Sequence, residues 1–73
     1  MSEISKIFGR NVRRCREAKG LTLVQLGEKT GMDESYVWRI EDGRVGPSVR
    51  SLNKLAAALE VSGSELMADM TAV

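Results

Sequence analysis

The 73-residue chain contains no histidine, one cysteine and one proline. A single thiol, Cys15, cannot form an internal disulfide, and without histidine the side chains that build a structural zinc site are missing. No apolar run approaches the roughly 18 residues that a membrane span needs, and no signal-peptide pattern opens the chain. We therefore expect no metal, no cofactor and no membrane partner.

Groups for catalysis are also scarce. The chain has no histidine base, no recognisable nucleophile–base pair and no glycine-rich phosphate loop. A chain of this length leaves little room for a substrate pocket. An enzyme is therefore the weakest of the function classes, no catalytic residue is assigned, and no small-molecule ligand or ligand-sensing domain is expected.

Charge of both signs is present but unevenly placed. A net charge of +1 does not by itself indicate a polyanionic partner. Residues 6–19, however, carry six bases and one acid, whereas residues 55–73 carry three acids and no base. The N-terminal part of the chain is therefore basic and the C-terminal part mildly acidic.

Every periodic segment has the spacing of a helix, and none alternates as a strand does. Thr22 and Gln25 have the spacing of a capping box, and Asp33 is expected to cap the following helix with its carboxylate. Glycines and caps divide the chain into five expected helices, at about 5–19, 23–30, 33–42, 47–59 and 62–70. We expect one domain over residues 1–73, an all-α, compact five-helix bundle.

Residues 22–42 carry the pattern of a helix-turn-helix. Gly31 lies at the bend, where a positive φ costs glycine little, and Gly27 allows the second helix to cross closely. Val37 and Ile40 are spaced to turn inward and anchor that second helix. The turn has the short, glycine-bearing form that this motif requires.

Landmarks at matching spacings extend beyond the motif, from Phe8 to Leu66. They are "REAKGLT", Leu26-Gly27, Gly31, Ile40-Glu41-x-Gly43, Pro47-Ser48, Leu55-Ala56-x-x-Leu59 and Val61-Ser62. With these landmarks the chain resembles the phage repressor/Cro-type (XRE) helix-turn-helix family, including small stand-alone members such as restriction–modification controller proteins. The resemblance implies a lambda repressor-like DNA-binding fold whose third helix enters the major groove, usually as a homodimer on a palindromic operator. It also implies an ion pair between Arg16 and Glu41.

On a helical wheel, the third helix turns Glu34, Ser35, Trp38, Arg39 and Asp42 outward. The resemblance places base contacts at Glu34, Ser35 and Arg39, with Trp38 beside them. Arg39 suits guanine O6 and N7, Glu34 suits cytosine N4, and Trp38 suits a thymine methyl or a sugar edge. The alternatives are that Glu34 is an ordinary first-turn acid and that Trp38 packs on the surface beside the core.

Phosphate contacts are expected around this helix. Thr22 and Ser48 begin the second and fourth helices, whose N-terminal N–H groups favour anions. The remaining candidates are Arg44, Arg50 and Tyr36.

Leu23 departs from the family, in which many members have a glutamine that bonds a phosphate. Together with Val24 it leaves two adjacent apolar groups at the start of the second helix. This weakens the expected DNA anchor and suits contact with another protein.

The apolar residues near the C-terminal end exceed what a small bundle needs. We expect a dimerisation helix at about 62–70, with a plain core as the alternative. Its candidate interface residues are Val61, Leu66, Met67 and Met70.

Together these features predict a sequence-specific DNA-binding transcriptional regulator. The expected partners are double-stranded DNA and a second copy of the chain, with RNA polymerase as a further candidate, in the cytoplasm at the nucleoid. The alternative is a protein-binding module that keeps the fold without reading DNA. Leu23, Val24, Glu34 and the low net charge favour that alternative. The basic first helix and the arginines Arg39, Arg44 and Arg50 argue against it.

Overall fold

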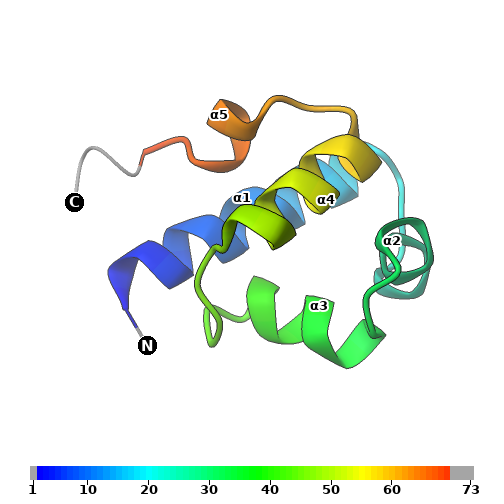
Figure 1. The fold of residues 1–73 in the computed structure, drawn as a ribbon, viewed down its shortest axis with the longest axis horizontal. Helices are drawn as coiled ribbons and strands as arrows, with labels where there is room; N and C mark the ends of the chain where they lie inside the picture. Colours follow the sequence, from blue (N-terminus) through cyan, green and yellow to red (C-terminus); the bar gives the residue numbers. More distant parts are fainter. Residues whose placement is uncertain (1, 70–73) are drawn as a thin grey trace.

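Five helices follow one another in the computed structural model, which describes residues 2–69 (Figure 1). None of these residues forms a strand. The order of elements confirms the expected all-α fold. The helices are α1 (Glu3–Ala18), α2 (Leu23–Thr30), α3 (Glu34–Glu41), α4 (Val49–Leu59) and α5 (Gly63–Leu66).

Both ends of α1 are set by local hydrogen bonds. The helix begins before the predicted start at Ser5, because the Ser2 hydroxyl accepts a hydrogen bond from the Ser5 backbone N–H at 3.0 Å. After its last turn Gly20 adopts a left-handed φ of 71°. This lets the Leu21 N–H donate to the Arg16 carbonyl oxygen at 3.1 Å and closes the helix end.

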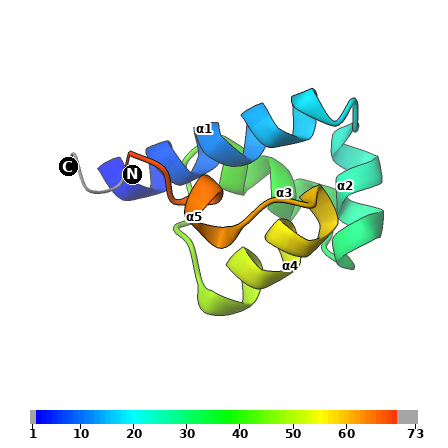
Figure 2. The same ribbon diagram turned by 90° about the horizontal axis from the view of Figure 1, so that it is seen from above.

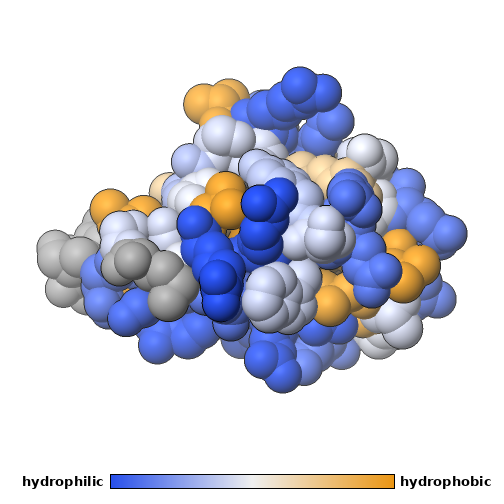
Figure 3. All heavy atoms as spheres, turned by 90° about the horizontal axis from the view of Figure 1, so that it is seen from below, coloured by the Kyte–Doolittle hydropathy of each residue, from blue (hydrophilic) through white to orange (hydrophobic). Residues whose placement is uncertain are grey.

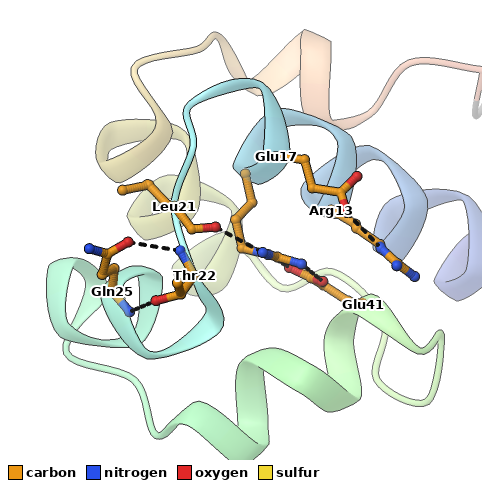
Figure 4. Close-up of polar contacts among 7 residues, drawn as sticks. Arg13, Glu17, Leu21, Thr22, Gln25 and Glu41 are labelled. Atoms are coloured by element: carbon orange, nitrogen blue, oxygen red, sulfur yellow. Dashed lines mark hydrogen bonds and ion pairs between the residues drawn. The ribbon is translucent and has the colours of Figure 1, made fainter.

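The caps of α2 and α3 differ. Thr22 and Gln25 form both halves of the predicted capping box, with N–H···O distances of 3.1 and 2.9 Å (Figure 4). The prediction for Asp33 is wrong, since Asp33 occupies the N-cap position of α3 but makes no side-chain capping bond. Its carboxylate instead accepts a hydrogen bond from the nearby Ser35 hydroxyl at 3.0 Å.

The short α5 corrects the helix predicted over 62–70. It contains only four residues, and Met67 already lies at its C-terminal cap. The amide of Asn11, on α1, donates to the carbonyl oxygens of Leu66 and Ala68, each at 2.9 Å. Because α1 holds the carbonyls at this helix end, the chain turns instead of continuing the helix. Met70 lies outside the described residues.

The core lies where the five helices converge, and α2 contributes Leu26 to it. Helix α5 contacts both α1 and α4 and lies between them in Figure 2. Helix α3 packs against α1 and α2, which leaves its other side open. The buried apolar side chains of this core are Phe8, Val12, Cys15, Leu26, Val37, Ile40, Leu55, Leu59 and Leu66.

Within the part of the chain that the structure describes, the helices are too short or too polar to cross a membrane.

Candidate nucleic-acid interface

Helix α3 has one buried and one exposed side, as the helical wheel predicts. Val37 and Ile40 are fully buried, whereas Trp38 keeps 45% of its surface exposed. The side chains predicted to contact bases, Glu34, Ser35, Trp38 and Arg39, are all exposed, as is Asp42. The view from below, the side on which α3 lies in Figure 1, shows a mainly hydrophilic surface with separate hydrophobic patches (Figure 3).

Arg39 and Arg44 each lie over an aromatic ring. The Arg39 guanidinium is 5.7 Å from the centroid of Tyr36, and the Arg44 guanidinium is 5.3 Å from the centroid of Trp38. Arg44 also forms an ion pair with Asp42, with 2.7 Å between Nε and Oδ2. These stacked positions hold both arginines beside the exposed side of α3, although such exposed contacts contribute only about 0.5–1 kcal/mol each.

Three of the residues predicted to contact phosphate line one hollow. Tyr36 from α3 and Ser48 and Arg50 at the start of α4 surround it, together with Lys54. The sequence interpretation missed Lys54, although it follows Arg50 by four residues and so shares its helix face. Thr22 lies apart from them, at the start of α2. The hollow thus combines a helix N-terminus with two cations, an arrangement suited to an anion.

The structure contains the ion pair expected between Arg16 and Glu41. Two nitrogens of the guanidinium donate to the two carboxylate oxygens at 2.7 and 3.0 Å, and a third donates to the Leu21 carbonyl oxygen at 2.8 Å (Figure 4). Both side chains are largely buried. The hydrogen bond to Glu41 raises the pKa of Arg16 above its ordinary value, although burial acts in the opposite direction. The charged pair joins α1 to the last residue of α3 and so orients that helix.

A second set of hollows surrounds Leu23. Leu23 is half-buried and lines two of them, and Trp38 lines both as well. Its neighbour Val24 is 48% exposed. The apolar pair predicted at the start of α2 is therefore partly accessible, beside the exposed side of α3.

The candidate dimer residues do not share one environment. Leu66 is fully buried within a single chain. Its side chain has no surface left for a partner, so its assignment to the interface is wrong. Val61 and Met67 pack against the core but remain partly exposed.

Two residues that position the interface were missed from the sequence. Asn11 is 2% exposed and connects α1 to α5 through the hydrogen bonds described above. At Gly9, an added Cβ would lie 2.7 Å from the Glu41 carbonyl oxygen and closer still to that of Ile40. A glycine within an otherwise amphipathic helix was the available signal of this close approach.

Two helices joined across residues 31–33, the second with an exposed polar side, define a helix-turn-helix domain. Residues 7–68 match the model of the family described as "Helix-turn-helix domain", and the chain belongs to that family. It is 38% identical over 65 residues to the uncharacterized HTH-type transcriptional regulator y4dJ of Sinorhizobium fredii, covering 89% of this chain and 84% of that protein. Other curated relatives are longer, and this chain spans between 40% and 61% of their length.

Solved structures share the fold, among them two restriction-modification controller proteins. The restriction-modification controller protein C.AhdI from Aeromonas hydrophila is 39% identical, with a TM-score of 0.81, and the match covers 85% of this chain and 94% of that one. The restriction-modification controller protein C.Esp1396I, solved as a tetramer in complex with its natural 35 base-pair operator, is 26% identical. Its TM-score is 0.81, and the match covers 90% of this chain and 87% of that one.

Proposed function

We propose that this protein is a sequence-specific transcriptional regulator that binds double-stranded DNA, with α3 in the major groove. The observation that carries the proposal is the exposed side of α3, on which Glu34, Ser35, Trp38 and Arg39 lie together. The similarity to C.Esp1396I, which was solved with its operator, supports it.

Some side chains on and around α3 would contact bases, and others would contact backbone phosphates. Arg39 suits bidentate contact with guanine, and Glu34 suits the amino group of cytosine, each discriminating against a wrong base by about 1–3 kcal/mol. Ser48, Arg50 and Tyr36, which share a hollow, would hold a phosphate and so set the register. Thr22 and Arg44 are the remaining phosphate candidates.

The proposed active form is a homodimer on a two-fold symmetric operator. Val61 and Met67 are the partly exposed apolar candidates for its interface, and Met70 is retained from the sequence prediction. Two copies of α3 would enter major grooves separated by about one DNA turn, ~10–10.5 bp, or a multiple of it. Action at the nucleoid in the cytoplasm and contact with RNA polymerase belong to the same proposal.

The proposal is tested by selecting random duplex DNA with the purified protein at about 150 mM salt, followed by sequencing. We expect enrichment of one two-fold symmetric site. The absence of any enriched site, from protein whose helical circular dichroism shows it to be folded, would refute DNA reading. It would instead favour the protein-binding module suggested by Leu23 and Val24.

A further inference from the structure

A hollow lies where the start of α2 meets the start of α3. It is lined by Leu23 from α2 and by Asp33, Glu34, Ser35 and Trp38 from the α3 region. Leu23 and Trp38 also line the hollow beside it, toward Glu41 and Asp42. The proposed reading helix therefore has an apolar lining at one edge, to which a second helix contributes.

The lining combines apolar and acidic groups. Leu23 and Trp38 offer hydrocarbon and aromatic surface, whereas Asp33 and Glu34 contribute two carboxylates. The Asp33 carboxylate accepts a hydrogen bond from the Ser35 hydroxyl at 3.0 Å. These two negative charges repel a phosphate oxygen, so the group that occupies the hollow should be uncharged.

The major groove of DNA displays one apolar group among its hydrogen-bonding base edges, the 5-methyl group of thymine. We propose that Leu23 and Trp38 together form a contact site for a thymine methyl group. This assignment rests on the proposed function, since it requires α3 in the major groove. It gives Leu23 a role in reading a base.

The test removes the methyl group without changing the protein. Each thymine of the selected site is replaced in turn by deoxyuridine, which lacks only the methyl group, and binding is measured by fluorescence anisotropy. Removing one buried methyl should weaken binding about fourfold, and removing the symmetric pair in both half-sites about 15-fold. A cytosine placed at the same position should bind more tightly when it is replaced by 5-methylcytosine.

Protein variants assign the effect to this hollow. In Leu23→Ala the difference between thymine and deoxyuridine should largely disappear. Val24→Ala is the matched control, because Val24 is an exposed apolar neighbour on the same helix that does not line the hollow. It should keep the full difference. Circular dichroism checks that both variants are folded, since Leu23 also packs against the core.

The outcomes separate this assignment from the proposed function. Failure to select any site would overturn both. An enriched site at which every thymine tolerates deoxyuridine would overturn the methyl contact while leaving DNA reading established. A deoxyuridine penalty that persists undiminished in Leu23→Ala would assign the methyl contact to other side chains and overturn the role of Leu23.

Discussion

Gly9 is the position at which one added methyl group tests how α1 holds the proposed reading helix. A Cβ at Gly9 would lie 2.7 Å from the Glu41 carbonyl oxygen, whereas ordinary contact begins at 3.4 Å. Both nearby acceptors, on Ile40 and Glu41, are backbone oxygens of α3, so no side-chain rotation relieves the clash. The two helices must separate by roughly 0.7 Å or more, an overpacking that costs about 1–3 kcal/mol.

Alanine favours a helix over glycine by about 1 kcal/mol, which offsets part of that cost. We therefore expect Gly9→Ala to lose up to about 2 kcal/mol of a total stability of roughly 4–11 kcal/mol for a chain of this length. Urea unfolding followed by circular dichroism measures the loss.

The matched control is Gly63→Ala, in the first turn of α5. Its Cβ would lie 3.8 Å from a Leu52 methyl group, an ordinary contact, so this variant should be neutral or slightly more stable. If Gly9→Ala raised the urea midpoint as much as Gly63→Ala does, the close approach of α1 to α3 would be refuted.

Further variants test the ion pair, the interface and the end of α5. Arg16→Met should lower the free energy of unfolding by about 3–5 kcal/mol, because it leaves the Glu41 carboxylate buried and unpaired. The double variant Arg16→Met with Glu41→Leu should lose less stability than the two single variants combined. Additive losses in urea unfolding would contradict the coupling of the two side chains. Arg39→Ala should relax selectivity at one base pair per half-site in competition binding. Arg50→Ala should weaken binding to all DNA sequences alike and reduce the slope of log affinity against log salt concentration by about 1 per half-site. Asn11→Ala should cost about 1–3 kcal/mol by leaving buried carbonyls unpaired, and an unchanged urea midpoint would show that those hydrogen bonds contribute little.

The features predicted correctly from the sequence depend on local spacing. The capping box of Thr22 and Gln25 needs only two residues three apart, and the inward turn of Val37 and Ile40 needs only the helical period. The pairing of Arg16 with Glu41, 25 residues apart, came from the resemblance to a family and not from any local pattern.

The predictions of the Asp33 cap and of the end of α5 were wrong because other groups form hydrogen bonds with the capping atoms. The Asp33 carboxylate has a hydroxyl two residues away, and that hydroxyl binds it in place of the helix N–H groups. The carbonyl oxygen of Leu66, the last residue of α5, is bound by Asn11, 55 residues earlier, so no inspection of residues 62–70 could locate the end of this helix. Both errors arise because capping positions have more than one available partner.

The acids around α3 affect how the proposed interface would gain specificity. Arg44 is already paired with Asp42 and stacked on Trp38, so binding a phosphate exchanges one anionic partner for another. That exchange would contribute little net free energy, because the contact with Asp42 is lost when the phosphate is bound. The contribution would be the same on any sequence, because backbone phosphates do not vary with sequence. In the proposed interface Glu34, at the leading end of the helix, would repel phosphates but would accept a hydrogen bond from a correctly placed amino group. In the proposed interface the acids would therefore lower the sequence-independent part of the affinity and leave the base-dependent part intact, which would raise the ratio of specific to non-specific binding.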